Sequence, residues 1–281
     1  DILLNQAWNQ YVTDFGNNRN PKVGNLFYLI YNQKMKFQVK TDLGTNPLKE
    51  VMLIPFSKER NSDITEYAYK SVYQIYNKAG NETVKGINTY ILANVGSDLY
   101  DVEEIGDYVK VKIQDPFLKN HFYIYINNSY YISIRNRTKK VIGADYFISA
   151  FVKPEDERMV VTEMAFIPVY PDHGFTVDSS KEIDFAKNRL LARGDFKDIL
   201  FLKPPRYTIV YKLFPEKNYI PDFLLLEKET RKIATIVEIF CYYTKEYQEE
   251  QKEKIAYYSS LPEYNFIAWE VNKGQNMPYV P

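Results

Sequence analysis

Residues 219–240 read YIPDFLLLEKETRKIATIVEIF, and this stretch decides the fold of the second half of the chain. Two apolar runs flank the polar segment KETRK, a pattern that predicts a β-hairpin. Each run contains one acid, Asp222 in the first and Glu238 in the second. If the turn centres on Thr230, antiparallel pairing places these two acids directly opposite each other. Like charges in that position destabilise a sheet unless a cation lies between them. The pair therefore predicts a cation site.

Mg²⁺ fits this demand, because it prefers hard oxygen ligands and is commonly held by one or two protein carboxylates. It also keeps bound waters that can be activated for hydrolysis. For either acid alone, an ordinary solvated or lysine-paired carboxylate is the simpler interpretation. The two acids together, in register on an otherwise apolar hairpin, favour Mg²⁺ or Mn²⁺.

The elements around the hairpin follow a definite order. The sequence predicts a helix over 179–194, a strand over 206–214, the two hairpin strands, a helix over 244–261 and a last strand over 264–271. The order is α-β-β-β-α-β, and the predicted class of this half is α/β.

Pro221 and Asp222 form a PD pair, Glu238 follows on the next strand in VEIF, and both lie inside this order of elements. The region 178–272 therefore resembles the PD-(D/E)XK nuclease superfamily. The resemblance implies a restriction-endonuclease-like core whose carboxylates hold one or two Mg²⁺ or Mn²⁺ ions. It also implies that the metal activates a water for in-line attack on phosphorus, and that a lysine orients this water.

The chain departs from the superfamily pattern at Phe240, which stands where that lysine is expected. It is similar in this respect to members that carry the lysine on the following helix, such as Vsr-like enzymes and viral cap-snatching endonucleases. Lys252 and Lys254 are the candidates here. Lys254 is favoured, because it lies beside the predicted buried stripe of Ile255 and Tyr258. The alternative is that both lysines lie on a solvated helix face.

Two further ligands follow from the resemblance, namely Glu182 on the first helix and the backbone carbonyl of Ile239. Glu182 also has a local explanation, since SSKE makes Ser179 and Glu182 a capping box, and the two roles are compatible. His173 is predicted to be a loop histidine rather than a ligand, and Cys241 to be a packing residue rather than a nucleophile.

Basic residues flank the predicted site. Arg206 and Lys212 face the same way on their predicted strand and are candidates for phosphate contacts, as is Lys252. Lys203 and Lys217 also lie nearby in sequence. Ordinary surface charge is the alternative interpretation for each of them.

The first half contains short β-patterned runs and one predicted helix over 63–80, which indicates a mostly antiparallel α+β domain. FYIYINNSYYISI, residues 122–134, predicts a hairpin with Asn127 and Asn128 at the turn. A change to charged residues and proline around 152–178 indicates a boundary. We therefore expect two domains. Residues 1–155 form an α+β domain whose candidate role is to bind substrate or a partner, and residues 156–281 form a nuclease-like domain.

The bulk composition limits the possible partners and compartments. The chain has 281 residues, with 36 Lys plus Arg and 36 Asp plus Glu, so no overall field attracts nucleic acid. A single cysteine suits a reducing, cytoplasmic setting. No apolar run is long enough for a membrane span, and the start shows no secretory signal.

The function predicted from the sequence is a metal-dependent endonuclease that acts on nucleic acid, with DNA favoured over RNA. One alternative is a nuclease-like fold without catalysis that binds nucleic acid or protein, which Phe240 and the zero net charge favour. Another is a structural component of a viral or mobile-element assembly. The oligomeric state is left open.

Overall fold

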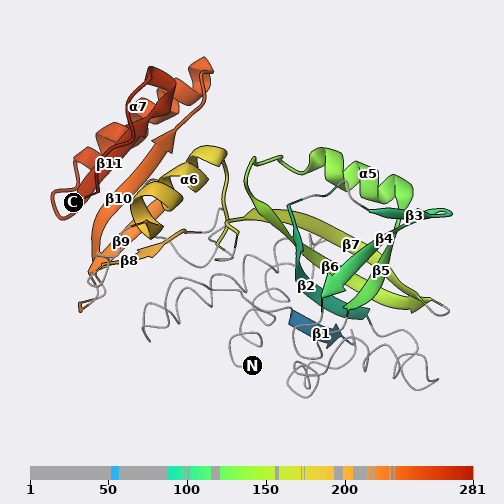
Figure 1. Ribbon diagram of the computed structural model, residues 1–281. Coiled ribbons are helices and arrows are strands. Elements are labelled where there is room, and N and C mark those ends of the chain that lie inside the picture. Colours follow the sequence, from blue (N-terminus) through green and yellow to red (C-terminus); the bar gives the residue numbers. More distant parts are fainter. Residues whose placement is uncertain are drawn as a thin grey trace.

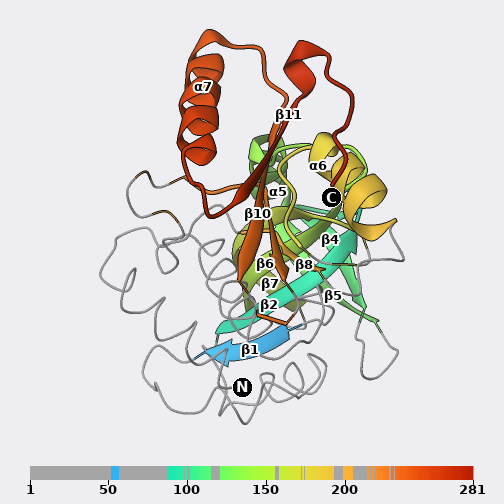
Figure 2. The same ribbon diagram turned by 90° about the vertical axis from the view of Figure 1, so that its left-hand side faces the viewer.

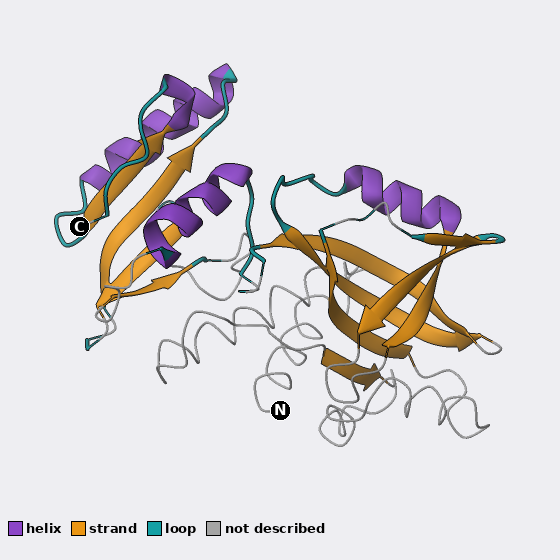
Figure 3. Cartoon of the chain, in the orientation of Figure 1, coloured by secondary structure: helices purple, strands orange, loops and turns teal. Residues whose placement is uncertain are grey.

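The computed structural model of the chain describes residues 52–56, 88–97, 99, 102–114, 121–155, 158–171, 173, 175–192, 199–204, 214, 217, 219–227, 229–230 and 232–280. These residues form a mixed α/β structure with a seven-stranded sheet and a four-stranded sheet. Figure 1 shows the two sheets side by side, and Figure 3 shows the helices that accompany each of them.

The seven-stranded sheet, called here the large sheet, has the order β1-β2-β6-β7-β5-β4-β3. Its neighbours are antiparallel except for β5 and β7, as the sequence predicted for the strands of the first half. In β4 the buried Val109, Val111 and Ile113 alternate with lysines, which is the pattern of a strand with one face on the core. The strands are β1 (Met52–Phe56), β2 (Asn88–Gly96), β3 (Glu103–Ile105), β4 (Tyr108–Gln114), β5 (His121–Asn127), β6 (Asp145–Glu155) and β7 (Arg158–Val169).

The hairpin predicted over 122–134 is wrong in its second half. After β5 the chain enters helix α5 (Asn128–Arg137), which lies over the large sheet. Asn127 is the N-cap, and its side-chain oxygen accepts hydrogen bonds from the backbone N–H groups of Ser129 and Tyr130. The cap satisfies donors that a helix start leaves unpaired, so it favours helix over the strand that alternation predicted.

Several predictions fall outside the described residues. They are the helix over 63–80 and most of the strand over 206–214, of which the structure describes only Phe214. The strand that pairs with β9 (Phe223–Glu227) is instead β8 (Ile199–Leu202), which the sequence analysis assigned to no element.

The four-stranded sheet, called here the small sheet, has the order β11-β10-β9-β8. Strands β9 and β10 (Ile233–Phe240) pair antiparallel, while β10 and β11 (Asn265–Glu270) are parallel. The pairs Thr235–Leu225, Ile236–Leu224 and Val237–Phe223 are symmetric about Thr230, so the predicted register is confirmed. The register shifts nearer the turn, between Ile233 and Thr235.

Helices cover both faces of the small sheet. The first is α6 (Ser180–Phe185) with its π-helical continuation Ala186–Leu191, and the second is α7 (Lys245–Ser259) between β10 and β11 (Figure 2). Phe185 packs against Trp269, whereas Tyr258 packs against Phe266. Residues 266 and 269 point to opposite faces of β11, so the two helices lie on opposite faces. None of the described helices has the length and apolar character needed to cross a membrane.

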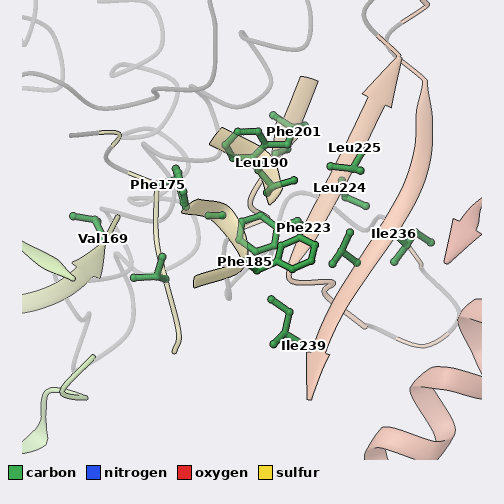
Figure 4. Close-up of a cluster of buried hydrophobic side chains, with 14 of the residues drawn as sticks. Val169, Phe175, Phe185, Leu190, Phe201, Phe223, Leu224, Leu225, Ile236 and Ile239 are labelled. Carbon is green, nitrogen blue, oxygen red and sulfur yellow. The ribbon is translucent and has the colours of Figure 1, made fainter. Parts of the chain in front are cut away.

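The two sheets share one apolar cluster. Val169 at the end of β7 belongs to the same cluster as Phe175, Phe185 and Phe223, and Figure 4 shows these side chains around the small sheet. The predicted division between residues 155 and 156 falls between β6, which ends at Glu155, and its partner β7, which begins at Arg158, whereas the large sheet ends at Val169 and α6 begins at Ser180. The division into domains stays a prediction.

Candidate active site

The predicted site residues converge at one edge of the small sheet, where β9 begins and β10 ends. Asp222 immediately precedes β9, and Glu238 lies near the end of β10. Both acids line a pocket of about 450 Å³. Other residues that line it are Lys139, Asp178, Ser179, Glu182, Lys203, Pro204, Tyr219, Ile220, Pro221, Ile239, Cys241, Tyr242, Tyr247, Glu250 and Lys254.

The Asp222 carboxylate is held by two groups. Its Oδ2 atom accepts a 2.7 Å hydrogen bond from the backbone N–H of Ile239, and its Oδ1 atom lies 3.4 Å from the Lys203 Nζ atom. The N–H and C=O of one strand residue point to the same side. The Ile239 carbonyl therefore faces the same gap as Asp222, which is the position that the sequence analysis assigned to a backbone ligand.

The Glu238 carboxylate is almost fully buried, and its Oε1 atom has no hydrogen-bond partner among the described residues. Lys254 Nζ lies 3.6 Å from this atom, which is an ion pair without a hydrogen bond. Burial raises the pKa of Glu238 to about 8, and Asp222 adds to the rise while Lys254 opposes it. The Oε1 atom is thus an acceptor without a hydrogen bond, next to a second carboxylate, while the nearby Tyr258 hydroxyl acts on the same carboxyl group and lowers its pKa.

Lys203 is the centre of a buried charge cluster. Its Nζ atom lies 2.8 Å from Glu182, 3.5 Å from Asp178 and 3.4 Å from Asp222. Burial alone would lower the pKa of Lys203, but these three carboxylates outweigh it and raise that pKa well above its ordinary value. Its interpretation as surface charge is therefore wrong, because a cation with three acidic neighbours is stable inside the protein.

Glu182 is tied to the start of α6 as well as to Lys203. The Ser179 Oγ atom accepts a bond of 3.2 Å from the Glu182 N–H, and Glu182 Oε2 accepts one of 3.0 Å from the Asp178 N–H. The first bond is the predicted cap, while the second goes to the residue before the cap. Burial and the neighbouring acids raise the pKa of Glu182 to about 8, although Lys203 opposes the rise.

The structure separates the two candidate lysines of α7. Lys254 lines the pocket and also lies 3.5 Å from Glu250, whereas Lys252 is exposed and does not line the pocket. Although burial opposes its charge, the acids Glu238, Asp222 and Glu250 raise the pKa of Lys254. It remains a cation at neutral pH.

The remaining residues singled out in the sequence have different positions. Arg206 and Lys212 fall outside the described residues, and Lys217 is exposed. His173 packs against Tyr170 in the loop after β7, with ring centroids 5.4 Å apart. Cys241 lines the pocket, and burial raises the pKa of its thiol, which disfavours a reactive thiolate.

The pocket's donor set suits a hard divalent cation. Asp222, Glu238 and the Ile239 carbonyl supply oxygen atoms, and the unpartnered Glu238 oxygen is an acceptor that such a cation would satisfy. Within the described residues, however, no group of three or more His, Cys, Asp or Glu side chains is arranged to hold a metal ion. The pocket therefore offers two carboxylates, those of Asp222 and Glu238, to a metal ion. The third candidate, Glu182, is paired with Lys203 instead.

Sequence reasoning missed several residues of the pocket. Asp178 and Lys139 come from loops, and Tyr247 lies in the first turns of α7. Lys203 had a weak local signal, because it directly follows the apolar run Ile199–Leu202, at the end of what the structure shows to be β8. Recognising that strand would have placed Lys203 beside Asp222.

Comparison of the chain with protein-family models, with curated proteins and with solved structures finds no match.

Proposed function

We propose that the chain is a metal-dependent endonuclease of PD-(D/E)XK type, with a restriction-endonuclease-like core formed by the small sheet, α6 and α7. The observation that supports this most directly is the buried, unpartnered Glu238 oxygen beside Asp222 in a pocket that also contains Lys254. Nucleic acid is the proposed substrate, with DNA favoured over RNA.

Asp222, Glu238 and the Ile239 carbonyl would hold Mg²⁺ or Mn²⁺ in this proposal. When bound, such an ion lowers the pKa of a water and neutralises phosphate charge. Glu182 contributes indirectly, because its carboxylate bonds the Lys203 ammonium, which in turn lies 3.4 Å from Asp222. Lys203 thereby orients Asp222 and balances its charge.

Lys254 is the proposed catalytic lysine. Its ammonium lies 3.6 Å from Glu238 in the pocket, so it can donate a hydrogen bond to an attacking water or to a phosphate oxygen. Negative charge grows on the phosphate as the transition state forms, and a positioned cation stabilises that charge. Phe240, which replaces the usual lysine, is buried and packs on Tyr247 instead.

The test is incubation of the chain with labelled single- and double-stranded DNA and RNA, with Mn²⁺ or with chelator. Cleavage with Mn²⁺ that disappears in chelator and in Glu238→Gln supports the proposal. Cleavage that persists in Glu238→Gln would point to a contaminant or to another site, and no cleavage of any substrate would refute the enzyme.

A nuclease-like fold without catalysis is the second candidate. Lys203 favours it, since its ammonium contacts Asp178, Glu182 and Asp222 and already balances part of their negative charge. Calorimetric titration with Mn²⁺ separates the two candidates. Binding that Asp222→Ala abolishes supports the enzyme, whereas no binding by the parent supports the module.

A further inference from the structure

A basic segment between α5 and β6 leads to the pocket. Residues 135–140 read RNRTKK and contain four basic residues, and no acid occurs between residues 128 and 144. The segment runs from the last turn of α5 to Lys139, which lines the pocket. The net charge of the chain is zero, so this segment is a local concentration of positive charge. It lies next to the pocket that contains Asp222 and Glu238.

Lys139 joins this segment to the small sheet. Its Nζ atom donates a hydrogen bond to the Tyr242 hydroxyl and lies 5.1 Å from the centre of that ring. Tyr242 also lines the pocket and packs edge-on against Tyr247, with ring centroids 5.0 Å apart. The pocket is thus lined both by the segment after α5 and by the segment after β10.

Two consecutive tyrosines directly after Cys241 are exposed, and the first of them lines the pocket. Tyr242 is 42% and Tyr243 is 69% exposed. Aromatic rings beside lysines and arginines are the combination that binds single-stranded nucleic acid, because unpaired bases stack on the rings while the cations contact phosphates.

The depth of the acids argues for the same substrate. The Glu238 side chain is 4% exposed and that of Asp222 is 18% exposed, so both carboxylates are recessed from the surface. A single strand is more flexible than a duplex, so its backbone can approach recessed groups more readily.

We propose that Arg137, Lys139, Lys140, Tyr242 and Tyr243, called here the rim surface, bind single-stranded nucleic acid and deliver it to the pocket. As a substrate assignment this rests on the proposed nuclease function, but binding at the rim surface does not require cleavage. Phosphates contact Lys139, Lys140 and Arg137, whose guanidinium also bonds Ser133 within α5, and bases stack on the two tyrosines.

The test is fluorescence anisotropy of a short labelled single-stranded oligonucleotide and of the matching duplex, in chelator, so that no cleavage occurs. We expect the parent to bind the single strand at least tenfold more tightly than the duplex. Tyr243→Ala is expected to weaken binding of the single strand roughly tenfold through lost stacking. For the double variant Lys139→Gln/Lys140→Gln, the logarithm of the binding constant should depend less steeply on the logarithm of the salt concentration. The slope is expected to fall by about 0.7 for each phosphate contact that is lost.

Lys187→Gln is the matched control, because Lys187 is exposed and does not line the pocket. Preference for the duplex, equal binding by Tyr243→Ala and the parent, or no binding of either oligonucleotide would overturn the proposal. A parallel cleavage assay with Mn²⁺ separates the two hypotheses. Rim binding without cleavage refutes the nuclease alone, and cleavage with unaltered binding in the rim variants refutes the rim surface alone.

Discussion

At the scale of single residues, Lys203 is the strongest candidate for a structural role in the pocket. Its ammonium is the shared partner of Asp178, Glu182 and Asp222. Removing one partner of a buried ion pair leaves uncompensated charge, which typically costs about 3–5 kcal/mol. Lys203→Met is therefore expected to reduce the free energy of unfolding by about this amount in urea denaturation.

Two comparisons make the Lys203 experiment specific. Lys187→Met changes an exposed lysine, so its expected effect is within about 0.5 kcal/mol. Adding Glu182→Gln to Lys203→Met removes one of the unpaired charges and should restore part of the loss. Equal stabilities of Lys203→Met and the parent would show that the cluster is not essential to folding.

Lys254 is predicted to act on the reaction rather than on metal affinity. Because its ammonium lies beside Glu238 in the pocket, Lys254→Met should reduce the cleavage rate by about 10²–10³ while Mn²⁺ affinity changes little. Lys252→Met, on the exposed side of the same helix, should have almost no effect on the rate. Rates from single-turnover cleavage and affinities from calorimetry check this. Reversed effects would assign the role to Lys252.

Glu238 predicts the pH dependence of the metal-free protein. Its pKa is raised from its ordinary value of 4.5 to about 8, so the folded state favours the neutral carboxyl. The contribution of the neutral Glu238 carboxyl to the free energy of unfolding is fully present below pH 4.5. It is lost as the pH rises through about 8, because the buried carboxyl must then ionise. In chelator, Glu238→Gln should match the melting temperature of the parent near pH 5 and exceed it by several degrees above pH 8.

Metal should reverse that difference. Mn²⁺ is expected to raise the melting temperature of the parent and to leave that of Glu238→Gln unchanged, because a ligand stabilises only the state that binds it. Glu249→Gln, on the exposed surface of α7, serves as the control. A parent that is insensitive to Mn²⁺ would remove the metal site from the proposal.

The sequence was sufficient to place Asp222 opposite Glu238, because register follows from the turn position and the alternation of β9 and β10. Helix phase favoured Lys254 but left Lys252 as a candidate, and the structure places Lys254 rather than Lys252 in the lining of the pocket. It could not identify the Lys203 cluster. That cluster depends on the burial of a lysine that follows a four-residue strand, and on loop residue Asp178, neither of which has a periodic signal.

At the scale of elements, Asn127 decides whether the segment after β5 is a strand or a helix. The run SYYISI alternates as a strand does, but Asn127 caps α5 through bonds to Ser129 and Tyr130. Asn127→Ala should therefore lower the free energy of unfolding by about 1 kcal/mol. Asn136→Ala, at an exposed position of the same helix, should have little effect in the same urea titration.

The failed hairpin prediction has a physical cause. Alternation over a few residues is compatible with strand and helix alike, and the competing evidence was a single side chain whose capping bonds form only in the helix. The strands β6 and β8 were missed for a different reason. β6 contains Pro154 and ends at the charged residues that suggested a boundary, and β8 has only four residues.

At the scale of the whole molecule, β7 determines how the chain can be divided. It pairs with β6 along its whole length and with β5 on its other side, so it is an inner strand of the large sheet. Val169 at the end of β7 forms a bridge with Thr176, and β7 shares the apolar cluster of the small sheet together with Leu92 of β2 and Phe147 of β6. A fragment that includes β7 without its neighbours would expose two unpaired strand edges.

This predicts opposite behaviour for two C-terminal fragments. Residues 170–281 contain the small sheet with α6 and α7, and should be soluble but less stable than the full chain, because Val169 and its neighbours no longer cover Phe175. Residues 160–281 add β7 with both edges unpaired, and should aggregate. Size-exclusion chromatography and circular dichroism of the two fragments decide the matter. A soluble, folded 160–281 together with an unfolded 170–281 would mean that β7 is integral to the small unit.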